Sequence, residues 1–305
     1  MSTMYHSPLA FPVRLQKDTI SVLDETRLPR KETYIAVRNL NDALEVLGQM
    51  KTRAFGQVLL FFYTCVLVGE IDTVAAAFKK TRPTFDFFQL ADILKRSAQQ
   101  TSRVCEAAET IIEGFDEKRR RRAQKLAEIL PAEAYILTIC NVNGELIYLF
   151  EALKERGKTA TFFVSETRPY LQGTRLTLWE LRQAGITARG ICDNQAAMAM
   201  KNGLINCIIT GSDRSNDKGD IINKIGTYAM ARLARYFHIP VFALTQFPRA
   251  MNIEEITIEE RPQEEVFMWL DGEGPWPEAL YPSFDITPSE FISGWIDISE
   301  EVRCT

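Results

Sequence analysis

The chain has 305 residues, of which 46% are hydrophobic and 25% are charged, and its formal net charge is -4. This composition is typical of a globular protein with one large domain or two, and it lacks the basic excess of a nucleic-acid-binding surface. The longest apolar stretch, residues 58–69, is shorter than the roughly 20 residues that cross a bilayer. We therefore expect no nucleic-acid partner and no membrane partner.

Cysteine and histidine usage argues against a metal site. The two histidines are His6 and His238, and the cysteines show no Cys-x-x-Cys spacing. Four of the cysteines lie in apolar or helical runs, as buried free thiols do, and this pattern predicts a cytoplasmic protein. No Gly-x-Gly-x-x-Gly motif follows a predicted strand, so neither a dinucleotide nor any other cofactor is expected.

The first part of the chain predicts a helical domain after a short extended segment. Apolar residues alternate roughly over residues 1–33, which predicts an extended or β-rich entry. From Glu32 to about Leu130 they recur every three or four positions, and Pro131 ends the last helix. We interpret residues 1–131 as an N-terminal segment with an all-helical domain, in which the basic cluster at 118–122 is a solvated helix face.

Short β runs alternate with helices over residues 132–305, a pattern that predicts a Rossmann-like, doubly wound parallel sheet. In such sheets ligands collect beyond the carboxyl ends of the strands. Three polar loops follow predicted strands, at Cys140, at 165–173 and at 211–220, and we expect them to share one crevice. The predicted strands are Ala134 to Thr138, Thr161 to Val164, Thr187 to Ile191, Asn206 to Thr210 and Val241 to Leu244.

The stretch from Gly211 to Thr227 is the strongest candidate for the chemistry. It is interpreted as the end of a strand, a polar loop and the start of a helix, with Asp220 as the N-cap. Asn223 and Lys224 would then share its first turn. Because a helix N-terminus carries unpaired N–H groups and partial positive charge, this arrangement predicts an anion site such as one for phosphate.

Several motifs spread over most of the chain resemble one known family. They are Leu23-Asp24-Glu25-Thr26-Arg27-Leu28-Pro29, Arg82-Pro83-Thr84, Thr138-Ile139-Cys140-Asn141, Glu166-Thr167-Arg168-Pro169, Gln172-Gly173-x-Arg175-Leu176-Thr177, Gly211-Ser212-Asp213-Arg214, Gly219 to Thr227, and Ile258-Glu259-Glu260-Arg261. Together they resemble the methylthioribose-1-phosphate isomerases. That family is similar to the regulatory subunits of the exchange factor in eukaryotic translation initiation, and to archaeal ribose-1,5-bisphosphate isomerases.

The resemblance implies a helical domain followed by a Rossmann-like domain, usually in a homodimer, with a sugar phosphate as the small-molecule partner. It implies that Cys140 and Asp220 carry the reaction. The residues that it assigns to substrate binding are Arg53, Arg82, Gln172, Asn223 and Lys224. The implied reaction is an aldose-ketose isomerisation of a 5-substituted ribose 1-phosphate, with 5-methylthioribose 1-phosphate as the leading substrate.

Two segments depart from the family pattern. Where the enzymes have Arg-Gly-Ala-Pro, this chain has Arg53-Ala54-Phe55-Gly56, and a Phe in place of Ala fills space beside the ligand. Where they have Thr-His-Cys-Asn, Ile139 replaces the histidine, and the following segment at 143–146 has an extra residue. These departures affect the expected substrate more than the reaction class.

Two further substrates and one further function stay open. The isomerase could act on 5-deoxyribose 1-phosphate or on ribose 1,5-bisphosphate. The chain could instead be a non-catalytic subunit that binds a sugar phosphate or a nucleotide in a regulatory assembly, like the exchange-factor subunits. Such subunits would not be expected to keep both Cys140 and Asp220, so the presence of both residues favours the enzyme.

Overall fold

The computed structural model describes residues 5–101, 103–246, 250–268, 270, 274–298 and 302–304. They form two compact units, one of residues 1–121 and 142–146 and the other of residues 122–141 and 147–305. The first boundary falls within helix α5 (Val104–Ile129), and the segment after Cys140 belongs to the first unit. Among the described residues, none of the helices has the length and apolar character needed to span a membrane.

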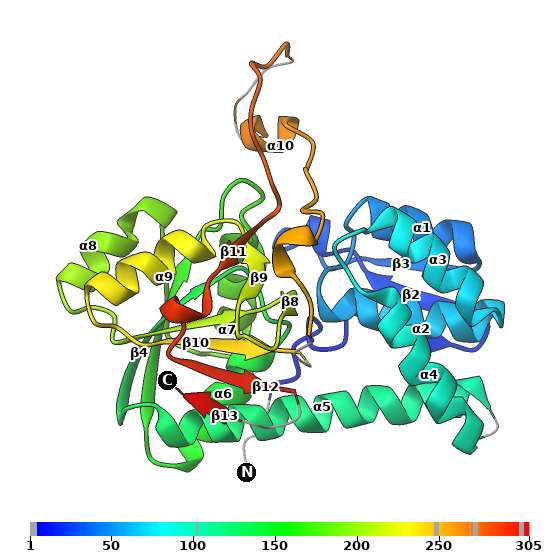
Figure 1. The fold of residues 1–305 in the computed structure, drawn as a ribbon, viewed down its shortest axis with the longest axis horizontal. Helices are drawn as coiled ribbons and strands as arrows, with labels where there is room; N and C mark the ends of the chain where they lie inside the picture. Colours follow the sequence, from blue (N-terminus) through cyan, green and yellow to red (C-terminus); the bar gives the residue numbers. More distant parts are fainter. Residues whose placement is uncertain are drawn as a thin grey trace. The chain divides into compact units, whose positions relative to one another are not determined.

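The first unit joins a small antiparallel sheet to a set of helices (Figure 1). The sheet has the order β1-β2-β3, and a core of buried phenylalanines, among them Phe61, Phe62 and Phe78, packs the helices together. Its elements are β1 (Val13–Gln16), β2 (Thr19–Leu23), β3 (Tyr34–Val37), α1 (Leu40–Gly48), α2 (Phe55–Val68), α3 (Ile71–Thr81), α4 (Phe87–Thr101) and the start of α5.

The prediction that this unit is all-helical from Glu32 onwards is wrong at its start. Residues 34–37 form β3, in which Ile35 pairs with Val22 of β2. A β-branched residue in a short run fits a pleated sheet better than a helix. The helical pattern begins at Leu40, after Asn39 caps α1 through a hydrogen bond from the Asp42 N–H.

The second unit confirms the Rossmann-like doubly wound sheet. Over the described residues its main sheet has the order β13-β12-β10-β7-β4-β5-β6, in which β13 is antiparallel to β12 and the other neighbours are parallel. All five predicted strands are present, and β12 and β13 were not predicted. The strands are β4 (Glu133–Ile139), β5 (Thr159–Ser165), β6 (Ala188–Ile191), β7 (Cys207–Gly211), β10 (Val241–Thr245), β12 (Gly294–Asp297) and β13 (Val302–Cys304).

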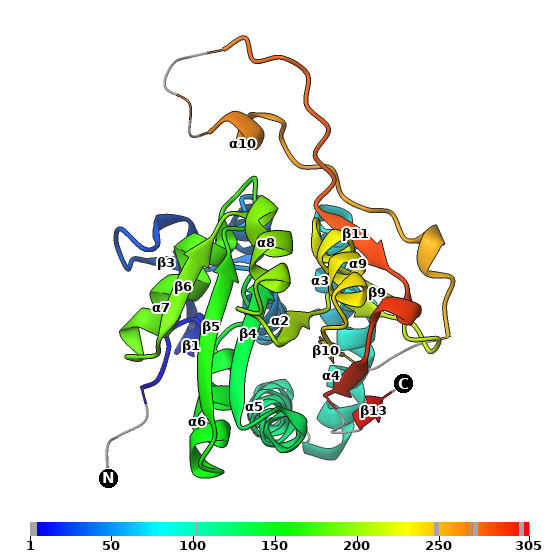
Figure 2. The ribbon, with the colours of Figure 1, turned by 90° about the vertical axis from the view of Figure 1, so that its left-hand side faces the viewer.

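Helices cover both faces of this sheet, as its buried apolar strands require. Helices α8 (Ala196–Lys201) and α9 (Thr227–Tyr236) pack on the face that carries Leu137 and Ile208. Helices α6 (Glu145–Glu155) and α7 (Leu178–Gln183) connect β4, β5 and β6 on the other side (Figure 2). A second sheet, β11-β9-β8, consists of β8 (Arg214–Ser215), β9 (Ile221–Lys224) and β11 (Phe284–Thr287).

Candidate active site

The order of the parallel strands locates a crevice in the second unit. The chain runs from β4 to β5 and β6 on one side, then returns to β7, β10 and β12 on the other. The carboxyl ends of β4 and β7 therefore flank the point where the strand order reverses, which is where open α/β sheets bind ligands. Cys140 follows β4, and the predicted Gly211 loop follows β7.

Asn223 is tied to this point. Its Nδ2 donates a 2.7 Å hydrogen bond to Thr210 Oγ1, and Thr210 is the register partner of Ile139, the residue before Cys140. The same amide nitrogen also donates to Thr227 Oγ1 at 2.9 Å. The sheet thus brings Cys140 and Asn223 to the carboxyl ends of neighbouring strands.

The Cys140 backbone turns sharply where β4 ends. Its φ is 65°, a left-handed value, and its N–H donates to Thr167 Oγ1 at 2.9 Å. Its carbonyl accepts a 2.5 Å hydrogen bond from Thr177 Oγ1. Two threonines from the predicted loop at 165–173 and from the turn after it therefore hold the half-buried thiol residue in place.

Gln172 follows β5 and is almost fully buried, with 3% of its surface exposed. Gly173 lets the turn close, because a Cβ at this position would lie 1.7 Å from the Ser165 carbonyl oxygen. The Gln172 Oε1 atom is buried and accepts no hydrogen bond from any residue that the structure describes. It is therefore an acceptor that a ligand hydroxyl could meet.

The predicted helix start at Asp220 is wrong. Residues 221–224 form strand β9, which pairs with β8 and β11, and α9 begins at Thr227 after Gly226 takes a φ of 101°. The pair Ile221-Ile222 favours a strand, and the helical spacing of the later apolar residues belongs to α9. Asp220, Asn223 and Lys224 therefore do not share a helical turn.

Asp220 lies in the hairpin that β8 and β9 form, on the side that faces β12. Its Oδ2 accepts a hydrogen bond from Asn216 Nδ2 at 2.9 Å, and its Oδ1 accepts one from the Ser289 N–H at 2.8 Å. Strands β7 and β10 lie between β12 and β4 in the sheet order, so Cys140 and Asp220 are anchored at different strands. That their side chains face each other across one cleft stays a prediction.

Lys224 is buried, with 7% of its surface exposed. Its Nζ lies 5.5 Å from the centre of the Phe284 ring and 5.8 Å from that of Tyr281, distances at which aromatic faces attract a cation. The side chain that caps α9 is Asp285, whose Oδ2 accepts the Gly226 N–H at 2.7 Å. Sequence reasoning missed Asp285, since nothing in its own segment indicates a helix that precedes it in the chain.

Asp193 is a second carboxylate that sequence reasoning missed. It follows β6, and its two oxygens accept hydrogen bonds from the Thr167 N–H at 2.9 Å and the Arg168 N–H at 2.7 Å. Ser165 Oγ also donates to it. The signal that could have found it is positional, because Asp193 lies beyond the carboxyl end of the predicted strand that ends at Ile191.

Arg53 belongs to the first unit, where the fully buried Glu25 holds its loop. Glu25 Oε1 accepts the Arg53 N–H at 3.0 Å and the Thr52 hydroxyl at 2.7 Å. The guanidinium approaches Glu25 Oε2 at 3.8 Å. This contact explains the carboxylate of the Asp24-Glu25-Thr26 motif as a structural support of the Arg53 loop.

The residues that replace Gly and Ala of the family pattern fit this loop in different ways. Ala54 takes a φ of 43°, a value that glycine adopts without strain. The Phe55 ring packs edge-on to Phe11 and lies 4.4 Å from the Arg119 guanidinium. Arg82, the other predicted arginine, is 5% exposed and its guanidinium contacts Met50 Sδ.

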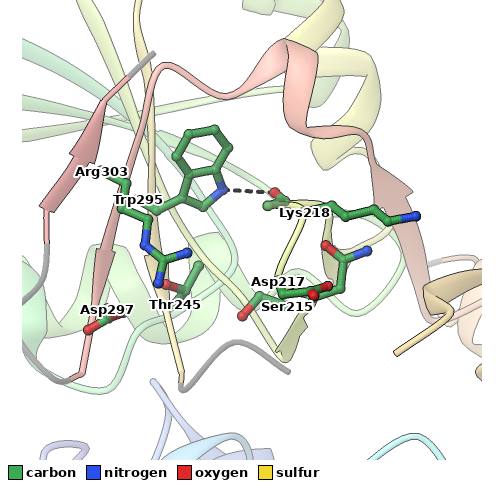
Figure 3. A pocket seen from close by; sticks show the side chains of 9 residues that line it. Ser215, Asp217, Lys218, Thr245, Trp295, Asp297 and Arg303 are labelled. Carbon is green, nitrogen blue, oxygen red and sulfur yellow. Dashed lines mark hydrogen bonds between the residues drawn. The ribbon is translucent and has the colours of Figure 1, made fainter. Parts of the chain in front are cut away.

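A cavity of about 120 Å³ lies on the β12 side of the second unit (Figure 3). Trp295 donates to the Gly219 carbonyl at 2.8 Å along its wall. Cys140, Asp220, Asn223 and Lys224 are not among its lining residues, although Asn216, which bonds Asp220, is one. The cavity therefore adjoins residues 215–219 and the carboxyl ends of β10 and β12, and Cys140 does not line it.

The model of the initiation factor 2 subunit family matches residues 36–297. The chain belongs to this family. Members similar to it include the methylthioribose-1-phosphate isomerase of Aquifex aeolicus, 33% identical over 93% of this chain and 67% of that protein. The enzyme of the same name from an Anaeromyxobacter species is 31% identical over 94% of this chain and 92% of its own.

Solved structures of family members share the fold. The 5-methylthioribose 1-phosphate isomerase of Pyrococcus horikoshii OT3 is 26% identical, with a TM-score of 0.75 over 100% of this chain and 96% of that one. The delta subunit of translation initiation factor eIF-2B from A. fulgidus is also 26% identical, with a TM-score of 0.76 over 96% of each chain. Enzymes and initiation-factor subunits of the family are thus both similar to this chain.

Proposed function

We propose that the protein is an aldose-ketose isomerase that converts a 5-substituted ribose 1-phosphate, with 5-methylthioribose 1-phosphate as substrate, into the ribulose 1-phosphate. The observation that supports this most directly is the switch point, where Cys140 follows β4 and the Asn223 side chain donates a hydrogen bond to the neighbouring strand β7. The identity to enzymes of that name over most of the chain supports the same reaction.

The chemistry requires an acid and a base. Phosphate on the anomeric carbon prevents spontaneous opening of the ring, so an acid must protonate the ring oxygen as its bond to C1 breaks. The C2 hydrogen then moves to C1, as a proton through an enediolate or as a hydride, and the C2 hydroxyl loses its proton to leave the ketone. We assign the acid to Asp220. Cys140 acts beside C1 and C2 as the base or as a stabiliser of the transition state.

Substrate contacts follow from the atoms that each side chain presents. Gln172 Oε1 accepts a hydrogen bond from a sugar hydroxyl, because this buried atom receives no hydrogen bond from any of the described residues. The Asn223 Nδ2 already donates to Thr210 and Thr227, so its Oδ1 is the atom left for a sugar hydroxyl. Lys224 attracts the phosphate. Arg53 and Arg82 are also assigned to the phosphate, for which a guanidinium supplies paired N–H donors.

The second candidate function is that of a non-catalytic regulatory subunit that binds a sugar phosphate or a nucleotide. The fold similarity to the eIF-2B delta subunit favours it. The presence of both Cys140 and Asp220 favours the enzyme. Isomerisation of 5-deoxyribose 1-phosphate or of ribose 1,5-bisphosphate is a variant of the first proposal. It stays open because the side chains named above are assigned to the phosphate and the sugar ring, and none is assigned to the substituent at C5.

A cytoplasmic homodimer is part of the proposal. Between β10 and β11, the described residues carry α10 (Glu264–Phe267) away from the sheet of the second unit (Figure 2). Apolar side chains on it reach solvent, with Leu280 85% and Met268 48% exposed. A second copy of the chain would bury such residues, which supports self-association.

The deciding experiment incubates the purified protein with ribose 1-phosphates that differ at C5 and follows formation of the ketose by NMR. Cys140→Ser and Asp220→Asn should each lower kcat by about a hundredfold or more, as loss of an acid or base does. Cys192→Ser and Asp217→Asn are matched controls, because both residues are exposed and Asp217 belongs to the same hairpin as Asp220. If the wild type formed no ketose from any of the substrates, the isomerase would be rejected. Full activity in either catalytic variant would show that the replaced residue does not have its assigned role.

A further inference from the structure

Asp285 closes the turn between β9 and α9. In the β11-β9 pair it lies directly opposite Asn223. Its Oδ2 accepts the Gly226 N–H at 2.7 Å, and its Oδ1 accepts the Tyr228 N–H at 3.2 Å (β9, β11 and α9 in Figure 2). One carboxylate from β11 therefore satisfies two of the N–H groups at the start of α9.

The same turn fixes the two proposed substrate-binding residues of β9. The Thr227 hydroxyl donates to the Lys224 carbonyl at 2.7 Å and accepts from Asn223 Nδ2. The Ile225 N–H donates to the Ser283 carbonyl at 3.1 Å. The orientation of Asn223 and Lys224 thus depends on the turn that Asp285 caps.

We propose that Asp285 is a positioning residue for the sugar-phosphate site, whose ionised carboxylate holds the β9–α9 turn in the form that presents Asn223 and Lys224 to the substrate. This inference rests on the proposed function. Asp285 does not touch the reacting atoms in this proposal. It acts through the two residues that precede the turn.

The surroundings of Asp285 make its ionisation sensitive near neutral pH. Burial raises the pKa of the Asp285 carboxyl to about 6, against the opposing effects of the Gly226 and Tyr228 N–H groups and the Lys224 ammonium. On α9, the Tyr228 phenol and the Arg232 guanidinium pack on each other. A protonated carboxyl is a weaker acceptor than a carboxylate, so the cap weakens as the pH falls through this range.

The test compares kcat and KM of the wild type and Asp285→Asn on 5-methylthioribose 1-phosphate between about pH 5 and pH 8. A sugar phosphate also loses its second proton near pH 6. Since that ionisation is common to both proteins, the ratio of their kcat/KM values isolates Asp285. We expect the kcat/KM of the wild type to exceed that of Asp285→Asn by about tenfold or more at the upper pH, mainly because the variant has a higher KM. At the lower pH this ratio should fall towards one.

Glu290→Gln is the matched control, because it removes a nearby exposed carboxylate that pairs with Arg235 and not with the turn. Its kcat/KM should equal that of the wild type at every pH. If Asp285→Asn does not fold, Asp285→Thr takes its place, since threonine suits a strand and keeps a neutral acceptor. A ratio that is constant with pH, or a KM equal to that of the wild type, would overturn the proposal.

Failure of the proposed function is a separate outcome. If the wild type forms no ketose from any substrate, the isomerase is rejected, and the comparison is made with inorganic phosphate instead. The phosphate-induced rise in melting temperature should then be larger for the wild type than for Asp285→Asn at about pH 8, and equal at about pH 5. Equal shifts at every pH would overturn the role of Asp285.

Discussion

Two charged side chains from distant parts of the chain hold segments that adjoin proposed site residues, one after Cys140 and the other around Lys224. In the first unit, Arg119 lies 3.3 Å from Glu145 Oε1 and donates to the Ala10 and Asn143 carbonyls. In the second unit, Asp285 caps α9 beside Asn223 and Lys224. A guanidinium stays charged at every accessible pH, whereas this carboxyl does not. The charge that Arg119 supplies beside the segment after Cys140 is therefore constant with pH, whereas the charge of the carboxyl that caps α9 beside Lys224 is not.

The largest effect should come from Arg119, which is 2% exposed. The prediction that the basic cluster at 118–122 is a solvated helix face is therefore wrong at Arg119 and at Arg122, which are both buried. Arg119→Met leaves the buried Glu145 without its cationic partner, and we expect the free energy of unfolding to fall by about 3–5 kcal/mol. Urea unfolding followed by circular dichroism measures this. Arg121→Met, at an exposed position of the same helix, should change the free energy by no more than about 0.5 kcal/mol. Equal losses in the two variants would show that the buried ion pair does not hold the segment.

The stability contributed by Asp285 should depend on pH. Its carboxyl stays protonated up to about pH 6 in the folded chain but only to about 3.8 in the unfolded chain. The folded state therefore gains from holding this proton below about pH 3.8, and it loses the gain as the pH rises to about 6. Relative to Asp285→Asn, the unfolding free energy of the wild type should fall by at most about 3 kcal/mol across this range.

Unfolding curves of both proteins at several pH values between about 4 and 7 measure the difference. Parallel dependence of the two free energies on pH would contradict a titrating Asp285. In the Arg119 pair, by contrast, the arginine adds no pH dependence of its own over the same interval.

The smallest effect concerns the backbone beside Arg53. Ala54 takes a left-handed φ of 43°, so Ala54→Gly should raise the free energy of unfolding by up to about 1 kcal/mol. Ala76→Gly is the matched control, because this exposed alanine lies inside α3 and its replacement should cost about 1 kcal/mol. Changes of the same sign in both variants would mean that the Ala54 conformation carries no strain.

Local sequence patterns were sufficient to predict the strands whose positions depend on the sequence of their own segment. Alternation and apolar runs identified the five strands β4, β5, β6, β7 and β10, and the position of Cys140 after β4 followed from the same pattern. The cap of α9 could not be found in this way, because the carboxylate comes from β11 and reaches the helix only through the β11-β9 pairing. Asp220 resembled an N-cap because Asp is common there, yet pairing of β9 with β8 and β11 outweighed that local preference.

The most direct test of a sugar-phosphate site at Cys140 is the rate at which iodoacetamide alkylates each cysteine, measured by peptide mass spectrometry with and without 5-methylthioribose 1-phosphate. Burial raises the pKa of the Cys65 thiol, and it raises that of Cys207 to about 12, so these two should react slowly in both samples. We expect the sugar phosphate to slow alkylation of the half-buried Cys140 by about tenfold or more and to leave the alkylation rate of the exposed Cys192 unchanged. Alkylation of Cys140 at the same rate in both samples, or no alkylation of Cys140 in either sample, would contradict a sugar-phosphate site at this residue.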